Sequence, residues 1–366
     1  MKIVFDHEIF YQQKYGGITS YFSNLGKQLI QKGVDIKFIC PVHKSFNLDK
    51  LPKKIVTGKR ISYPGFLNPI VNIINNQLSN RIYKKLNPKI IHRTYFSKKK
   101  FNNNLQNIIT FYDITHELSK TKEIENEKFK LIKKDNIKNS DHILCPSKTI
   151  KKDLIEYFNI NENKISVTYF SSDYEKISDS ELKKKKELQN YLLFVGNRSG
   201  YKNFKNFISA YAHSKKLKKD FKILIFGGEN KNICGKDVIF ENKLSHDSVK
   251  FVSGTNEYLQ YLYKNVRAFI YPSCYEGFGI PLIEAMRSGC PLVSSNGGAL
   301  REIAGDGTNF FNPNDCEDIT NKVEDLVYSE ENITKSIKYG LERSDHFSWS
   351  NCADKTIEAY KKILHY

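Results

Sequence analysis

Short runs of β-branched and aromatic residues alternate with helical patterns along the chain, and this alternation constrains the fold more than any other feature. The runs occupy residues 2–6, 34–41, 90–96, 107–113, 142–147 and 165–170, and then 191–196, 221–228, 248–254, 267–273 and 290–295. Strands that alternate with helices along a sequence pair in parallel and are covered by those helices. The sequence therefore predicts an α/β fold with parallel sheets.

The chain of 366 residues is longer than one hydrophobic core usually spans. An acidic and lysine-rich segment, residues 172–190, interrupts the alternation and has little apolar surface to bury. We therefore predict a first domain over 1–175, a linker over 176–190, a second domain over 191–345 and a final segment over 346–366. Because ligands of open parallel sheets bind beyond the carboxyl ends of the strands, two such domains facing each other would enclose a cleft.

Composition excludes several classes of protein. The opening MKIVFDHEIF resembles a first strand rather than a signal peptide, and the least charged stretch, residues 61–80, contains two Pro and many Asn, unlike a transmembrane helix. The seven Cys form no C-x-x-C pair, which argues against structural zinc and against a disulfide framework. We expect a cytoplasmic protein without a bound metal.

Positive charge is concentrated in the first half of the chain. Residues 1–180 contain 31 Lys and Arg against 17 Asp and Glu, and residues 44–100 contain 14 basic side chains and one acid, Asp49. One interpretation is a solvated, lysine-rich surface. The other is a basic and partly apolar face that meets an anionic membrane or a phosphate-bearing substrate. Nucleic acid is not an expected partner, because no zinc finger, RRM or basic helical motif accompanies the charge.

The segment YLLFVGNRSGYKNF, residues 191–204, predicts a strand, a glycine-containing turn and a helix that begins near Lys202. Arg198 and Lys202 would then lie beside a helix N-terminus, where backbone N–H groups and two cations suit a phosphate or diphosphate. The alternative is that both are ordinary surface charges. Near the start of the chain, Gly16 and Gly17 lie between the first strand and a predicted helix, where backbone can approach a ligand closely or simply turn.

A second loop carries paired carboxylates. In YEGFGIPLIEAMRSGCP, residues 275–291, Glu276 lies in a glycine-containing loop and Glu284 lies one turn into a predicted helix that has Pro281 in its first turn. Both carboxylates can then face one ligand. Carboxylates accept hydrogen bonds from vicinal hydroxyls, which ribose and hexoses offer. A surface position for Glu284 is the alternative.

Together these segments resemble the retaining glycosyltransferases of family four. The resemblance implies the GT-B fold, in which two Rossmann-like domains with parallel sheets face each other across a cleft and the second binds most of a nucleotide-sugar donor. It spans nearly the whole chain and is carried by GGITSYFSNL, ITFYDITHEL, NSDHILCPSKTIKKDL, VGNRSGYKN, SCYEGFGIPLIEAMRSGCP, SNGGALREIAGDG and FSWSNCADKTIEAYKKI. VGNRSGYKN is also similar to the variant in bacterial O-antigen and related surface-polysaccharide mannosyltransferases.

The resemblance implies roles for the residues that match the motifs. Arg198 and Lys202 would neutralise the donor diphosphate, and Glu284 would hold the ribose hydroxyls. Glu276 would hold the transferred sugar and is the candidate nucleophile if a protein carboxylate attacks. The resemblance favours the other route, in which the acceptor enters on the leaving-group face and the diphosphate acts as its base. The loop residues that would share the sugar with it are Gly277, Phe278 and Gly279.

Other implied contacts are spread over both domains. The first domain would bind the acceptor, and Gly16 and Gly17 would bring its backbone to the diphosphate. Val252 and Ser253 lie where the family contacts the nucleobase. The final segment, residues 346–366, would form a helix that returns to the first domain.

One departure from the family concerns the first domain. Family members often have His-Asp where this chain has Tyr112-Asp113. A tyrosine cannot act as a base near neutral pH, so His116 is an alternative to Tyr112 for the catalytic role. Asp113 is expected to be structural or to face the acceptor.

The expected reaction is metal-independent transfer of a hexose, with retention, from a nucleoside-diphosphate sugar to a glycan hydroxyl in surface polysaccharide synthesis. GDP-mannose is the first expectation for the donor and a UDP-sugar the second. The expected acceptor is lipid-diphosphate-linked, so the enzyme would contact the inner face of the cytoplasmic membrane through residues 44–100. Two alternatives remain: a non-catalytic nucleotide-sugar-binding subunit, and a nucleotide-sugar epimerase of the same two-domain plan.

Overall fold

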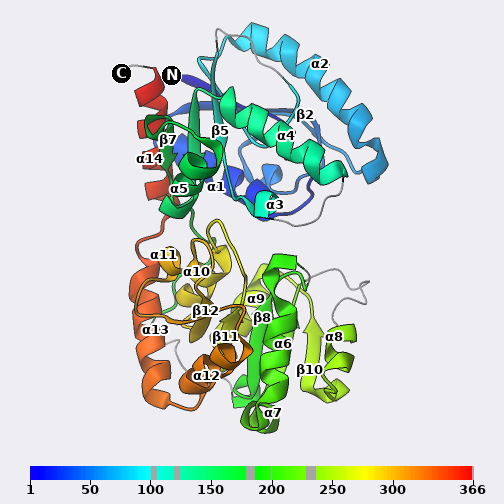
Figure 1. Cartoon of the computed structure of the whole chain (residues 1–366). Helices are drawn as coiled ribbons and strands as arrows, with labels where there is room; N and C mark the ends of the chain where they lie inside the picture. Colours follow the sequence, from blue (N-terminus) through cyan, green and yellow to red (C-terminus); the bar gives the residue numbers. More distant parts are fainter. Residues whose placement is uncertain (100–104, 119–123, 179–185, 199, 228–235, 365–366) are drawn as a thin grey trace. The chain divides into compact units, whose positions relative to one another are not determined.

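The computed structural model describes residues 1–99, 105–118, 124–178, 186–198, 200–227 and 236–364. These residues form two compact units (Figure 1), of which the first comprises Met1–Phe170 and Ser348–Tyr366 and the second Ser171–Phe347. This division falls between Phe170 and Ser171, and the domain and linker bounds given from the sequence stay predictions. Part of the predicted linker, residues 179–185, lies outside the described residues.

The first unit is built on a seven-stranded sheet with the order β3-β2-β1-β4-β5-β6-β7. Every neighbouring pair in it is parallel. The strands are β1 (Lys2–Phe5), β2 (Asp35–His43), β3 (Val56–Arg60), β4 (Ile90–Arg93), β5 (Gln106–Thr110), β6 (His142–Cys145) and β7 (Ile165–Val167). Because all the strands run the same way, the loops that follow them lie along one edge of the sheet.

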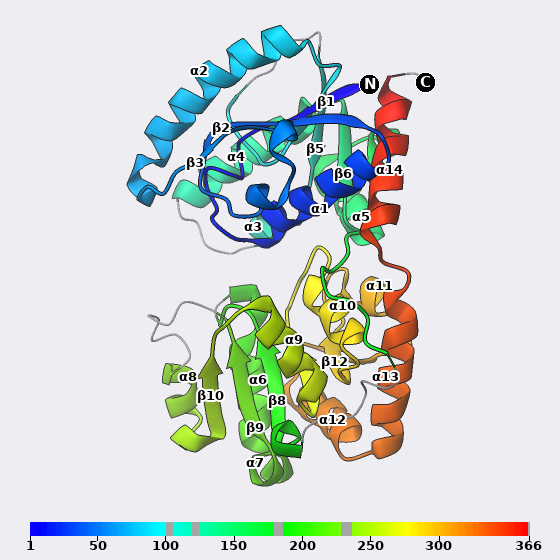
Figure 2. The same ribbon diagram turned by 180° about the vertical axis from the view of Figure 1, so that it is seen from behind.

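Helices cover this sheet, and the last one comes from the end of the chain. They are α1 (Gly17–Gln31), α2 (Asn68–Leu86), α3 (Thr115–Leu118), α4 (Ile124–Lys138), α5 (Lys148–Phe158) and α14 (Trp349–Ile363). Helix α1 buries an apolar stripe formed by Tyr21, Phe22, Leu25 and Leu29. Helix α14 packs beside α1 (Figures 1 and 2), and the hydroxyl of Tyr360 lies 2.7 Å from Nδ1 of the buried His92.

The second unit is built on a six-stranded sheet with the order β10-β9-β8-β11-β12-β13. Its neighbouring strands are again parallel. The strands are β8 (Tyr191–Val195), β9 (Lys222–Phe226), β10 (Val249–Val252), β11 (Ala268–Tyr271), β12 (Leu292–Ser295) and β13 (Asn309–Phe311). The helices are α6 (Phe204–His213), α7 (Lys215–Asp220), α8 (Lys236–Glu241), α9 (Asn256–Asn265), α10 (Ile280–Arg287), α11 (Leu300–Ala304), α12 (Cys316–Val327) and α13 (Glu330–Ser344).

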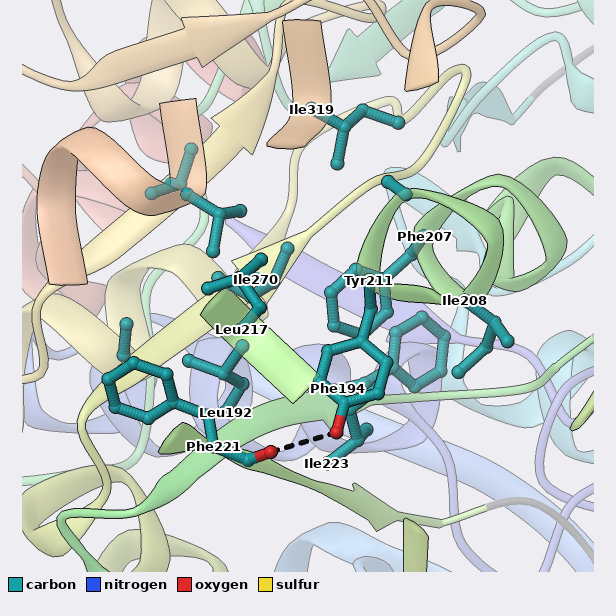
Figure 3. Close-up of a cluster of buried hydrophobic side chains, with 14 of the residues drawn as sticks. Leu192, Phe194, Phe207, Ile208, Tyr211, Leu217, Phe221, Ile223, Ile270 and Ile319 are labelled. Atoms are coloured by element: carbon teal, nitrogen blue, oxygen red, sulfur yellow. Dashed lines mark hydrogen bonds between the residues drawn. The ribbon is translucent and has the colours of Figure 1, made fainter. Parts of the chain in front are cut away.

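The core of the second unit lies between its sheet and helices α6 and α12. Figure 3 shows the cluster, in which Leu192, Phe194, Ile223 and Ile270 from the strands meet apolar side chains from the helices. Within the cluster, the buried Tyr211 hydroxyl donates a hydrogen bond of 2.8 Å to the carbonyl of Phe221, drawn as a dashed line in Figure 3. This packing holds the strands in place, and the loops at their carboxyl ends carry the candidate site.

The predicted parallel sheets are confirmed, and each contains one edge strand that the sequence analysis did not anticipate. These are β3 and β13, at the ends of their sheets. In the described part of the chain, no helix is long and apolar enough to cross a membrane.

Candidate functional site

The loop after β8 places two cations beside the start of α6. Gly196 takes a φ of 131°, a conformation that favours glycine, and turns the chain away from the strand. The buried Arg198 then donates from Nη1 to the carbonyl of Gly227, 3.1 Å away, and its guanidinium lies 5.3 Å from the ring centre of Phe251. Arg198 is therefore held between the ends of β9 and β10 and is not an ordinary surface charge.

Lys202 and Glu276 come from different loops and form an ion pair. Lys202 Nζ lies 2.6 Å from Oε1 of Glu276 and donates to the hydroxyl of Tyr271, 3.3 Å away. Both charged side chains are mostly buried. Burial and the Glu276 carboxylate raise the pKa of Tyr271, so this phenol stays protonated.

Backbone hydrogen bonds fix the loop that carries Glu276. The amide of Cys274 donates to the carbonyl of Tyr201 at 2.7 Å, and the amide of Ala299 donates to the carbonyl of Glu276 at 2.9 Å. Gly298 has a φ of 60°, and a Cβ there would lie 2.4 Å from that same carbonyl oxygen. The glycine turn after β12 therefore allows two loops to pack backbone to backbone, which positions Glu276 before any ligand arrives.

Helix α10 begins directly after this loop. Gly279 at its N-cap has a φ of 95°, and Pro281 lies in the first turn, as predicted. Phe278 is buried against Phe347, with ring centres 5.8 Å apart. The loop amides of Gly277, Phe278 and Gly279 therefore sit in a fixed backbone at the start of a helix, a position that suits hydrogen bonds to sugar hydroxyls.

Glu284 lies one turn into α10, and its carboxylate is in an unusual environment. The side chain keeps some exposed surface, but the surrounding protein strips enough water from the carboxyl to raise its pKa to about 7. The hydroxyl of Tyr263 donates to its Oε2 at 3.4 Å and opposes this shift, whereas Asp173 adds to it. Such a group titrates near neutral pH.

A neighbouring arginine shapes the same region. Arg287 donates to the carbonyls of Ser172, Tyr174 and Phe347 at 2.7–2.9 Å. These bonds hold the segment after Ser171 against α10 and bring Asp173 close enough to act on Glu284.

Val252 and Ser253, the predicted nucleobase residues, lie at the end of β10. The amide of Gly227 donates to the carbonyl of Val252 at 3.3 Å, which ties the end of β9 to the end of β10. Ser253 is exposed, and Val252 is half-buried. The structure therefore gathers Arg198, Lys202, Glu276 and the Val252–Ser253 pair along the carboxyl edge of one parallel sheet.

Gly16 and Gly17 lie at the start of α1 in the first unit. Gly17 is exposed and opens the helix, and a Cβ on it would meet no atom within 4 Å. A Cβ on Gly16 would touch the flexible end of Gln13. Neither glycine is therefore required by close packing against backbone within the first unit.

Tyr112, Asp113 and His116 follow β5 and are held by separate interactions. The Tyr112 hydroxyl donates to the carbonyl of Thr94 at 3.2 Å, and burial raises its pKa. Asp113 Oδ1 accepts from the amide and hydroxyl of Thr115, at 2.9 and 2.5 Å, which forms a turn into α3. His116 is exposed and packs on Phe129, 4.8 Å between ring centres.

A buried charged cluster in the first unit was missed by the sequence analysis. Asp6, His7 and Glu8 follow β1 and are all buried. Burial and Asp6 raise the pKa of Glu8 to about 8, an effect that Arg93 and Lys99 oppose, and burial lowers the pKa of His7 to about 4. The signal was available, since FDHE puts three polar residues at the carboxyl end of a parallel strand, where ligands bind.

Known proteins resemble the chain over most of its length. The profile described as Glycosyl transferases group 1 matches residues 173–343, and the profile described as Glycosyltransferase Family 4 matches residues 15–173. O-antigen chain mannosyltransferase RfbU of Salmonella typhimurium (strain LT2) is 30% identical over 77% of this chain and 78% of that protein. O-antigen chain mannosyltransferase B of Escherichia coli is 31% identical over 60% of each chain, so this match leaves two fifths of that relative unaligned.

Solved structures share the whole fold. Sucrose-phosphate synthase from Thermosynechococcus elongatus superposes with a TM-score of 0.78 at 18% identity, covering 100% of this chain and 99% of that one. Anabaena HepE, solved in complex with UDP and glucose, has a TM-score of 0.73 at 16% identity, covering 99% and 100%. The GT-B fold class predicted from the sequence is confirmed. With the RfbU match over most of its length and both profiles in agreement, the chain belongs to glycosyltransferase family 4, a family of retaining hexosyltransferases that use nucleotide-sugar donors.

Proposed function

We propose that the enzyme transfers a hexose from a nucleoside-diphosphate sugar to a hydroxyl of a glycan acceptor during surface polysaccharide synthesis. Mannose from GDP-mannose is the first candidate, since the two O-antigen relatives are named as mannosyltransferases. A UDP-sugar is the second candidate, because HepE was solved with UDP and glucose. The observation that carries the proposal is a pair of cations at one sheet edge, the buried Arg198 and the mostly buried Lys202, which is paired with Glu276.

Each candidate site residue of the second unit has a proposed role. Arg198 and Lys202 bind the donor diphosphate and stabilise the charge that develops on it as it leaves. Glu276 and the amides of the following loop hold the transferred sugar, and Glu284 accepts hydrogen bonds from the ribose hydroxyls. The end of β10, at Val252 and Ser253, meets the nucleobase.

The proposed reaction breaks the bond between the anomeric carbon and a diphosphate oxygen and forms a bond from that carbon to the acceptor oxygen. The transition state resembles an oxocarbenium ion, as in glycoside hydrolysis. The acceptor proton passes to the departing diphosphate, which then serves as the base on the same face of the sugar. Lys202 favours this route over attack by Glu276, because its ion pair lowers the nucleophilicity of the carboxylate.

The first unit is proposed to bind the acceptor, with Gly16 and Gly17 presenting backbone N–H groups to the diphosphate. Asp113 is assigned a structural role, because its Oδ1 accepts hydrogen bonds from the amide and the hydroxyl of Thr115 and so stabilises the turn into α3. Tyr112 and His116 remain the two candidates for supporting the donor sugar, and neither is assigned the role of base. The basic region 44–100 is proposed to face an anionic membrane that carries a lipid-diphosphate-linked acceptor, at the inner side of the cytoplasmic membrane.

Thermal unfolding in the presence of GDP, UDP, ADP and their sugar conjugates tests the proposal. A stabilisation that is selective for one nucleotide and weaker in Glu284→Ala is the expected result. Turnover of that donor with a glycan acceptor then separates a transferase from a non-catalytic binding subunit. Conversion of the donor alone into an isomer would favour the epimerase, and no stabilisation by any nucleotide would contradict the proposal.

A further inference from the structure

Helix α2 packs on the first unit with a face that is partly polar. Asn75 is fully buried, and its amide side chain forms two hydrogen bonds with the backbone of Val42 in β2, at 2.8 and 2.9 Å. One turn later the buried Ser79 lies 3.4 Å from Nδ1 of His7. A surface helix normally turns its apolar stripe toward the core, whereas α2 buries Asn75 and Ser79 there beside Val71 and Tyr83.

The opposite face of α2 is apolar and exposed. Figures 1 and 2 show the helix along the outside of the first unit. Large side chains spaced three or four residues apart form one stripe on it, continued from the short turn that precedes the helix. Their exposed fractions are Phe66 78%, Ile70 56%, Ile73 60%, Ile74 40% and Leu78 39%.

Positive charge continues this stripe toward the end of the helix. Arg81, Lys84 and Lys85 follow Leu78 at helical spacing, so they lie on the same outward face, and all three are exposed. No Asp or Glu occurs between Asp49 and Asp113 in the sequence. An apolar stripe that ends in a basic cluster complements a surface that is anionic outside and apolar beneath, which is the structure of an anionic lipid bilayer.

We infer that α2 is an interfacial membrane-docking helix. Its stripe, Phe66 to Leu78, enters the boundary between headgroups and acyl chains, while Arg81, Lys84 and Lys85 contact headgroup phosphates. A second copy of this chain fits the exposed face of α2 less well than a membrane does, because a symmetric contact through α2 would bring two such basic clusters together. The inference rests on the proposed function and deepens it, because that function takes the acceptor to be lipid-linked and places residues 44–100 at an anionic membrane.

Vesicle co-sedimentation of the full-length protein tests this inference. The vesicles consist of phosphatidylcholine alone or of an equal mixture with phosphatidylglycerol. Wild type is expected to bind the mixed vesicles, and Phe66→Ser/Ile70→Ser/Ile73→Ser is expected to bind them at least about tenfold more weakly. Its matched control is Leu131→Ser, which removes a side chain of 68% exposure from α4 of the same unit.

A second set of variants tests the basic end. Arg81→Gln/Lys84→Gln/Lys85→Gln is expected to bind the mixed vesicles more weakly than wild type, and the binding that remains should not depend on salt concentration. The control is Lys215→Gln/Lys218→Gln/Lys219→Gln, which removes the same charge from exposed positions on α7 in the second unit. Equal binding by the two charge variants would overturn the inference.

Two further outcomes are decisive. The docking role of α2 is wrong if the serine variant binds mixed vesicles as wild type does. It is also wrong if wild type binds no vesicle and is instead a dimer, and the serine variant is a monomer. Nucleotide-dependent thermal stabilisation, measured on the same variants, reports the second unit and separates the two proposals. Vesicle binding without nucleotide binding would support the docking helix and contradict the donor site. Nucleotide binding without vesicle binding would support the donor site and contradict the docking helix.

Discussion

Lys202 Nζ lies 2.6 Å from Glu276 Oε1, although 74 positions separate the two residues in the sequence. The pair joins the loop after β8 to the loop after β11. In this arrangement the ammonium group already has a carboxylate partner, so a donor diphosphate must share or replace that partner. The pair therefore keeps Lys202 in place for a diphosphate and keeps the Glu276 carboxylate oriented toward the same point.

The first prediction concerns this ion pair. Lys202→Met keeps the aliphatic stem and removes the charge, so the departing diphosphate loses one preorganised cation. We expect kcat to fall by about 10²–10³, the usual effect of deleting one such stabilising group. Steady-state kinetics with a soluble acceptor measures it. Lys205→Met is the control, since Lys205 pairs with Glu241 on an exposed surface of the same unit, and an equal loss in both variants would contradict the assignment.

A second prediction uses the pKa of about 7 at Glu284. If the ionised carboxylate accepts two ribose hydrogen bonds, donor affinity is full above pH 7 and falls by about tenfold for each pH unit below it. Titration calorimetry between pH 5.5 and 8.5, a range of about one unit or more on each side of that pKa, measures the donor affinity. The affinity should fall with decreasing pH in wild type and not in Glu284→Gln.

Tyr263→Phe sharpens that test. The Tyr263 hydroxyl lowers the pKa of Glu284, so removing it should raise the pKa and move the fall in affinity to higher pH. An unchanged midpoint in Tyr263→Phe would show that another group causes the pH dependence.

The third prediction concerns Gly17. An Ala at this position would meet no atom within 4 Å inside the chain, so Gly17→Ala should change the free energy of unfolding by less than about 1 kcal/mol. If the backbone meets the diphosphate there, the added methyl group should lower kcat/KM at least about tenfold. Gly65→Ala is the control, because a Cβ at Gly65 also meets no atom within 4 Å and Gly65 has no proposed role in the donor site. Full activity of Gly17→Ala would remove Gly17 from the donor site.

Much of this architecture could be predicted from the sequence because each of the parts concerned is local. The strand runs, the turn at Gly196 and the helix after Gly279 with Pro281 in its first turn are all encoded within a few neighbouring residues. Strands β3 and β13 were missed for a local reason too. VTGKR is polar and has a glycine in its middle, and NFF is only three residues long, so neither shows the pattern of a buried strand.

The missing parts of the candidate site depend on contacts between distant segments. Nothing near Glu284 in the sequence indicates that Tyr263 and Asp173 set its pKa, and nothing near Glu276 indicates the Ala299 amide. The partly polar inner face of α2 was hidden similarly, because its helical pattern alone does not say which side faces the sheet. Side-chain chemistry identified the candidates, whereas tertiary packing determined their environment.

The fourth prediction concerns a buried ion pair that holds the loop after β5. Lys133 Nζ lies 2.7 Å from Oε2 of Glu117 and donates to the carbonyl of Asp113 at 2.6 Å, and both charged side chains are buried. Lys133→Met leaves a buried carboxylate unpaired and should cost about 3–5 kcal/mol. Lys133→Met/Glu117→Leu should recover most of that loss, because both charges are then gone. Urea unfolding followed by the fluorescence of Trp349, the only Trp and part of the first unit, measures both, and equal destabilisation of the two variants would contradict the pairing.

The last prediction concerns the pH dependence that Glu8 confers on the first unit. Its pKa is about 8 in the folded chain, against an ordinary value of 4.5. Between these two values the folded chain holds a proton that the unfolded chain has released, so stability falls as pH rises through this window. Glu8→Gln keeps the shape and cannot ionise, so it should match wild type near pH 4.5 and exceed it by up to a few kcal/mol at pH 8 or above.

His7 provides the internal comparison. Its pKa is about 4 instead of 6.5, so the unfolded chain binds a proton that the folded chain does not, and its contribution to stability rises with pH over that window. The two slopes oppose each other between about pH 4.5 and 6.5, and only that of Glu8 remains from there to about pH 8. Trp349 fluorescence in urea at a series of pH values should therefore show a gain from Glu8→Gln that continues to grow above pH 6.5, where His7 no longer titrates. A gain that is constant with pH would mean that Glu8 is already ionised in the folded chain and that Arg93 and Lys99 outweigh its burial.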